Sequence, residues 1–127
     1  MRLGCIERDV FLSTPASLGD IVLFIIDEAP QELGITKLMK LVFLADVEYA
    51  QLFGVRLCAV DWTWYDHGPF SKHVYGAVEA LDEQGHVHDV FLNDRRLIQP
   101  SRTASPPRET SLTSPQRYAL RLSLIHI

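Results

Sequence analysis

The stretch that decides the fold is Trp62-Thr63-Trp64-Tyr65-Asp66-His67-Gly68-Pro69-Phe70-Ser71. Aromatic and β-branched residues before the glycine are typical of a strand. Gly68-Pro69 makes a corner, because proline holds its predecessor in extended backbone and out of a helix. Ser71 can then accept a hydrogen bond from the first free N–H groups of a helix. The stretch therefore predicts a strand, a sharp corner and a helix start.

The strand is predicted over residues 56–65, where side chains alternate between two faces. One face carries Val60, Trp62 and Trp64, and we expect the two tryptophans to fill the core. The opposite face carries Asp61, Thr63 and Tyr65. Four large rings within nine residues are more than a small core needs, so the exposed candidates for contact with a partner are Tyr65, Asp66, His67 and Phe70.

Two helices are predicted before this strand and one after it. The first begins at Thr14-Pro15, is apolar nearly all round, and ends by Pro30. The second begins at Ile35-Thr36 with Thr36 as its cap and stops at Gly54. Its buried face is Leu38, Leu41, Val42, Ala45, Tyr49 and Leu52, while Lys37, Lys40, Asp46 and Glu48 lie off that face. The third follows Ser71, buries Val74, Ala77, Val78 and Leu81, and ends at Gly85.

A β-hairpin is predicted last, with strands over 86–92 and 95–99 joined by Asn93-Asp94. The fold class is thus α+β, predominantly helical, in a winged-helix-like order of helix, helix, strand, helix and β-hairpin, in which the strand after the second helix joins the hairpin. Residues 1–13 are an N-terminal extension and residues 14–100 the folded domain. Residues 101–127, rich in Ser, Thr, Pro and Arg, are expected to form a disordered tail. Its last six residues resemble a translated sequencing-adapter remnant, so we expect the native chain to diverge within the tail.

Charge is unevenly distributed along the 127 residues. The net charge is -4, and the tail contributes +3 from Arg102, Arg108, Arg117 and Arg121 against Glu109, which leaves -7 on residues 1–100. An acidic body repels a phosphate backbone, which weighs against nucleic-acid binding. The longest apolar run, at residues 21–26, is far short of the roughly 20 residues of a membrane span. The charged N-terminus lacks the apolar segment of a signal peptide, so we expect a cytoplasmic protein.

Metal and catalytic sites are not favoured by the sequence. His86 with His88, or His67 with His73, could supply two metal ligands, but no coordination set is completed. Cys5 and Cys58 are expected to be unpaired thiols. Asp46 with Glu48, or Asp61 with Asp66, could be paired carboxylates for acid–base chemistry. The sequence defines no cleft around either pair, so both are interpreted as surface charge. We expect neither an enzyme nor a cofactor.

Two linked motifs carry a family resemblance. The first is Ile35-Thr36-Lys37-Leu38-Met39-Lys40-Leu41-Val42-Phe43-Leu44-Ala45-Asp46, and the second is Tyr65-Asp66-His67-Gly68-Pro69-Phe70-Ser71 followed by Val74-Tyr75. Together they resemble the Panacea domain, the SocA-like antitoxin family, over residues 16–100. Asp66-His67 departs from the family pattern, and helical elements that follow the hairpin in many members are not predicted here.

The resemblance implies a bacterial, archaeal or phage protein that neutralises a toxin by protein contact, the toxin being commonly encoded next door. One branch of the family hands its toxin to a protease as an adaptor. By position, the partner-binding surface implied for this chain is Lys37, Lys40, Tyr65, His67, Gly68, Pro69, Phe70 and Tyr75. A small winged-helix transcriptional regulator is the alternative, although the third helix has one lysine against three acids.

Overall fold

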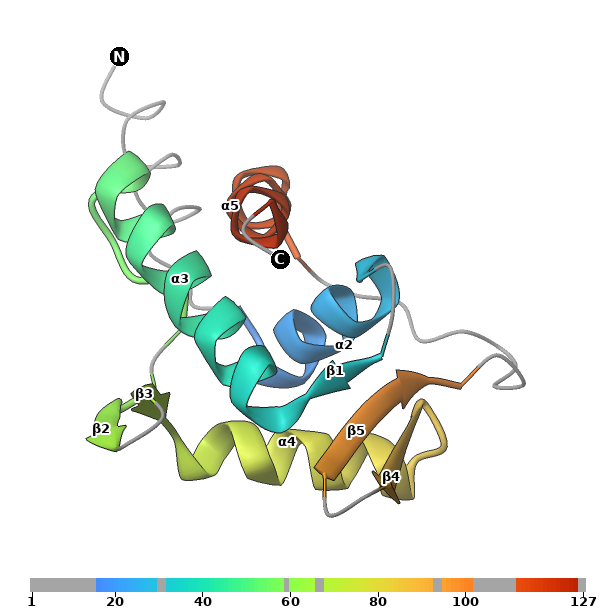
Figure 1. Ribbon diagram of the computed structural model, residues 1–127. Coiled ribbons are helices and arrows are strands. Elements are labelled where there is room, and N and C mark those ends of the chain that lie inside the picture. The colour runs from blue at the N-terminus through green and yellow to red at the C-terminus, as the bar shows by residue number, and fades with distance from the viewer. Residues whose placement is uncertain are drawn as a thin grey trace.

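The computed structural model describes residues 16–29, 32–58, 60–65, 68–92, 95–101 and 112–125. These residues form a mixed α+β fold of four helices and two small antiparallel sheets (Figure 1). In chain order the elements are α2 (Leu18–Glu28), β1 (Leu33–Gly34), α3 (Ile35–Phe53), β2 (Thr63–Tyr65), β3 (Gly68–Phe70), α4 (Lys72–Glu83), β4 (Val87–Leu92), β5 (Arg95–Pro100) and α5 (Ser114–Leu124). The predicted N-terminal extension and the Asn93-Asp94 connection lie outside the described residues. The prediction that the first helix begins at Thr14-Pro15 is wrong, because α2 begins at Leu18 with Ser17 as its N-cap.

The longest helix, α3, departs from the predicted pattern at Thr36, at Leu52 and at Asp46, which is buried. It ends as expected at Gly54, whose φ of 75° places it in the left-handed region that glycine adopts without strain. Its N-cap is Gly34, so the prediction that Thr36 caps the helix is wrong, because β1 delivers the chain into the helix two residues earlier. Leu52 is half exposed, because the last turn extends past the elements that cover the rest of the apolar face.

Helix α2 lies at the centre of the core, as its all-round apolar sequence predicts. Ile21, Val22 and Ile25 are fully buried, and the helix contacts α3, α4, α5 and β5. Helix α4 packs on α2, and its buried residues are Val74, Val78 and Leu81. The predicted cap of α4 is confirmed, since the Ser71 hydroxyl accepts a hydrogen bond from the backbone N–H of His73 at 3.1 Å.

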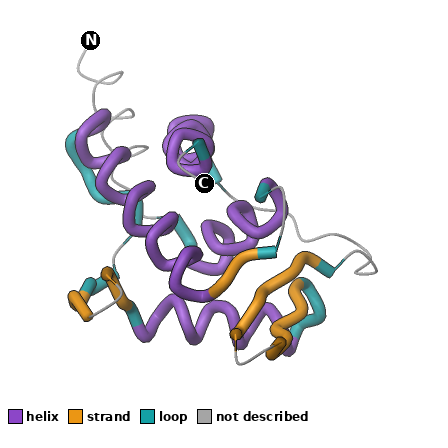
Figure 2. The backbone as a smooth tube through the Cα atoms, viewed as in Figure 1, coloured by secondary structure: helices purple, strands orange, loops and turns teal. Residues whose placement is uncertain are grey.

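The main sheet has the strand order β1-β5-β4, and β4 and β5 form the predicted hairpin. The strand that joins this hairpin is β1, in which Leu33 pairs with Ile98, and both side chains are buried. The prediction that the strand after the second helix joins the hairpin is therefore wrong. That strand, β2, pairs instead with β3, which follows it after only two residues, and the two form a separate sheet beside the start of α4 (Figure 2). Only residues 63–65 of the predicted strand 56–65 are extended in a sheet.

The predicted disorder of the C-terminal tail is wrong for residues 112–125. Helix α5 begins with a capping box, in which Thr113 and Gln116 exchange hydrogen bonds between side chain and backbone, followed by Pro115 in the first turn. Ala119 and Leu120 are fully buried where α5 packs on α3 and α2. This short apolar face folds because the two other helices give it a partner, although the surrounding composition is typical of a disordered segment. Residues 102–111 lie outside the described part of the chain.

Among the described residues, no helix combines the length and the apolar character needed to cross a membrane.

Candidate functional site

A groove of about 220 Å³ lies where the β2–β3 sheet meets the first turns of α3 and α4. The predicted site residues Tyr65, Gly68, Pro69, Phe70 and Tyr75 all line it. The structure therefore brings five of the eight predicted partner-binding residues together around one concave surface. His67, also predicted, lies outside the described residues.

Gly68 has a φ of 112°, a backbone conformation that residues other than glycine rarely adopt. Gly68 and Pro69 are the first two residues of β3 and pair with β2, so the prediction that they form a corner between a strand and a helix is wrong. Pro69 is buried, and Tyr65 pairs with Gly68 across the hairpin. The local sequence thus fixes the position of the rings on both sides of the glycine.

The rings of the groove are stacked in a continuous row. Tyr65 stacks on Phe70 with 4.9 Å between ring centroids, and Phe70 lies 5.5 Å from Tyr75. The guanidinium of Arg96 lies over the Tyr75 ring at 4.8 Å from its centroid. Arg96 in turn donates hydrogen bonds from Nε to both carboxylate oxygens of Asp89, at 2.9 and 2.8 Å. We call these five residues the aromatic ladder; it ties the β2–β3 sheet to α4 and to the β4–β5 hairpin.

The hydrogen bonds to Asp89 are the main reason that the pKa of Arg96 is raised above its usual value. The Arg96 side chain is 15% exposed, so its positive charge is paired with Asp89 and largely shielded from solvent. Arg96 therefore fixes the Tyr75 ring, and the groove's charge comes from elsewhere.

Lys37 and Lys40, the two remaining predicted residues, are exposed on α3 and do not line the groove. Lys40 nevertheless lies at its edge, because its Cε would be 3.4 Å from a Cβ placed on Gly68. Ile35, Thr36 and Met39 of α3 also line the groove and were missed as site residues by the sequence analysis. Their signal was their i, i+1, i+4 spacing, which places them on one face of the first turns of α3.

Trp64 is 70% exposed, so the prediction that it fills the core is wrong. The regular alternation assumed for residues 56–65 fails because only the last three residues form a strand. The Trp64 ring contacts Phe43 of α3 edge-on, at 6.0 Å between centroids, while Trp62 contacts the same ring at 5.4 Å and is partly buried, as predicted. Trp64 and the half-exposed Tyr65 are thus large rings presented to solvent by β2.

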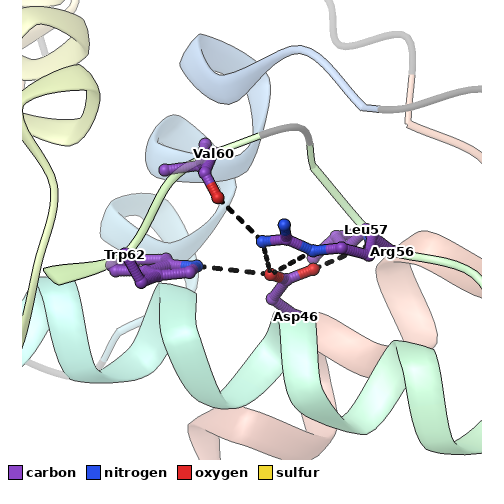
Figure 3. Close-up of polar contacts among 5 residues, drawn as sticks. All are labelled: Asp46, Arg56, Leu57, Val60 and Trp62. Atoms are coloured by element: carbon purple, nitrogen blue, oxygen red, sulfur yellow. Dashed lines mark hydrogen bonds and ion pairs between the residues drawn. The ribbon is translucent and has the colours of Figure 1, made fainter.

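Asp46, interpreted from the sequence as surface charge, is 5% exposed and organises the chain after α3 (Figure 3). Its Oδ1 accepts a hydrogen bond from the backbone N–H of Leu57 at 2.9 Å. Its Oδ2 accepts from Arg56, whose Nε is 3.2 Å away, and from the indole N–H of Trp62 at 3.3 Å. Arg56 also donates to the carbonyl of Val60 at 2.8 Å. The carboxylate thus pairs the backbone N–H of Leu57 and anchors side chains of residues 56 and 62, which lie outside any sheet, and sequence spacing on one helix could not reveal this.

A second, more open hollow of about 410 Å³ lies over this network and is lined by Phe43, Asp46, Val47, Ala50, Arg56, Val60, Asp61 and Trp62. Of its charged groups, the Asp46 carboxylate and the Arg56 guanidinium already bind each other, and Asp61 is exposed. The polar groups here stabilise the segment that carries β2, and the hollow has no free acid–base pair among its described residues.

Cys58 lies directly after this network and is 1% exposed. Burial raises the pKa of the Cys58 thiol to about 12. Since the thiolate is the reactive species, we expect Cys58 in a Cys5→Ser variant to react with a disulfide reagent at pH 8 at least about 100-fold more slowly than in 6 M guanidinium. The folded thiol stays protonated while an unfolded thiol ionises above about pH 9, so its contribution to stability falls as the pH rises from about 9 to 12. Equal labelling rates with and without denaturant would contradict this burial.

Among the residues that the structure describes, no group of three His, Cys, Asp or Glu side chains is placed to hold a metal ion. His86 and His88, considered above as a pair of ligands, are partly buried and exposed respectively. The site is therefore defined by a row of aromatic rings, the paired strands β2 and β3 and the exposed Lys40 at its edge. Such a surface can bind by apolar contact and charge, and the described groups lining it provide no nucleophile paired with a base.

Comparison of the chain with protein-family models, with curated proteins and with solved structures finds no match.

Proposed function

We propose that the chain is a protein-binding module of the antitoxin type, which neutralises a cognate toxin by direct contact and has no chemistry of its own. The observation that supports the proposal is the groove, whose eight lining residues all belong to the two Panacea-like motifs and include five of the predicted partner-binding residues. Tyr65 in this lining and its neighbour Trp64 on β2 are both exposed, and aromatic rings are the side chains that most often dominate the energy of protein interfaces. The proposed setting is a prokaryotic or phage-derived cytoplasmic system.

The test is co-expression with the product of the adjacent gene. We expect that product to arrest growth alone and to be neutralised when this chain is present. A Trp64→Ala variant should lose neutralisation, because it removes an exposed ring without emptying the core. Tyr118→Ala is the matched control, since Tyr118 is 55% exposed on α5, away from the groove residues. The proposal fails if the neighbouring product is harmless alone, or stays toxic with this chain present.

The sheet topology favours a second candidate, a small winged-helix transcriptional regulator. A strand between the first two helices that joins a hairpin after the third is an arrangement typical of winged helices, and β1, β5 and β4 have that order. In this candidate α4 would enter the major groove of DNA. Its exposed residues include Lys72 but also Glu79, Asp82 and Glu83, which a phosphate backbone repels. Duplex binding that persists above physiological salt would support the regulator over the antitoxin.

A further inference from the structure

We infer that the groove takes a short acidic segment of the partner protein, in which one large apolar side chain enters the groove and carboxylates beside it meet Lys37 and Lys40. This inference rests on the proposed function, because it assigns the chemistry of the partner that the same groove would bind.

The groove is shaped for a side-chain anchor. Its volume of about 220 Å³ is below the roughly 300–1,000 Å³ of pockets that enclose drug-sized ligands. Its walls are mostly apolar: two aliphatic side chains, a proline and the rings of Tyr65, Phe70 and Tyr75. The aromatic ladder holds these rings in place, so a bound anchor would meet a surface that is already ordered.

The charge at the groove is opposite to that of the body. None of the eight lining residues is acidic. The exposed Lys40 lies at the edge of the groove, and the exposed Lys37 lies about one helical turn before Lys40 on α3. The N-cap of α3, Gly34, provides no side-chain hydrogen bond to the first N–H groups of the helix, whose end carries a partial positive charge. A segment that binds here is therefore favoured by negative charge, although residues 1–100 carry -7 in total.

The same contrast distinguishes a short acidic segment from a nucleic acid. A short peptide can place one or two carboxylates against Lys37 and Lys40 alone. A duplex presents a long row of phosphates, which would also face the acidic exposed side of α4. Local positive charge on an acidic body thus selects a compact anionic partner segment.

The experiment is selection from a random dodecapeptide display library with the full chain as bait. We expect the enriched peptides to share a Phe, Leu or Trp flanked by Asp or Glu. Affinity of a labelled enriched peptide should fall about tenfold or more in a Lys37→Glu/Lys40→Glu double variant. Enrichment of basic or uncharged peptides, or no enrichment, would overturn the inference.

Two controls separate local charge and groove contact from other effects. Adding Glu79→Lys and Glu83→Lys on the exposed side of α4 to the double variant restores the net charge of the chain, and we expect no recovery of binding. Thr36→Trp should fill the groove and abolish binding, whereas Gln51→Trp, exposed at the far end of α3, should not. Thermal unfolding of each variant by circular dichroism verifies the fold, and recovery by net charge alone would contradict the inference.

The outcome is separable from that of the proposed function. If acidic peptides are selected but co-expression shows no neutralisation, the groove chemistry stands and the antitoxin proposal fails. If neutralisation occurs and survives both the Lys37→Glu/Lys40→Glu and the Thr36→Trp changes, the antitoxin proposal stands and this inference fails.

Discussion

Replacing Asp46 by alanine is expected to lower the free energy of unfolding by about 2–4 kcal/mol, or roughly 7–14 °C in Tm for a chain of this size. The change removes the acceptor for the backbone N–H of Leu57, for Arg56 and for the indole of Trp62. Leu57 is fully buried, so its N–H cannot turn to water, and leaving it unpaired carries the full cost of desolvation. The ion pair adds less, because the Arg56 side chain is 52% exposed.

Urea titration followed by circular dichroism measures the change, with Asp61→Ala as the matched control. Asp61 lines the same hollow but is exposed, and its removal should alter stability by less than about 0.5 kcal/mol. Asp46→Asn should fall between the two, because its amide oxygen can still accept from Leu57. If Asp46→Ala and Asp61→Ala proved equally mild, the carboxylate would not organise residues 56–62 as described.

Replacing Leu120 by aspartate is expected to destabilise the protein by about 4 kcal/mol or more, because it removes a core side chain and places a charge where α5 meets α3 and α2. This is a large part of the roughly 5–15 kcal/mol that stabilises a typical domain. The measurement is again urea unfolding, together with amide hydrogen exchange over residues 114–124.

Tyr118→Asp is the control for this change, since Tyr118 lies two residues earlier on the exposed side of α5. It should leave the unfolding midpoint within about 0.5 kcal/mol of the parent. The contrast is sharp, because a disordered tail would tolerate aspartate at both positions. Equal, negligible effects at Leu120 and Tyr118 would mean that α5 does not contribute to the core.

Much of the fold was predictable because its helices have strong local signals. The i, i+3, i+4 spacing of α3 and α4, the Ser71 cap and the stop at Gly54 all act within one or two turns, and sequence records such interactions directly. The groove was predictable to the extent that Gly68-Pro69 and the adjoining rings are close in sequence. Tyr75 joined them because one helical turn separates it from Ser71.

The rest depends on contacts between distant segments. β1 has two residues, and only its pairing with β5 makes it a strand, so no periodicity could reveal it. Asp46 is buried because Leu57 and Trp62 return to it from another segment. Trp64 is exposed because the strand that carries it is too short to maintain the alternation. The helical order of residues 114–124 requires the faces of α2 and α3 that it covers.

Both tryptophans of the chain lie at this one corner, Trp64 on β2 and Trp62 just before it. Trp62 donates its indole N–H to Asp46, whereas Trp64 is largely open to solvent next to Tyr65 on β2. The intrinsic tryptophan fluorescence of the whole protein therefore originates here, with one emitter hydrogen-bonded to a buried carboxylate and one exposed to solvent. Changes in that emission report on this part of the molecule without any added label.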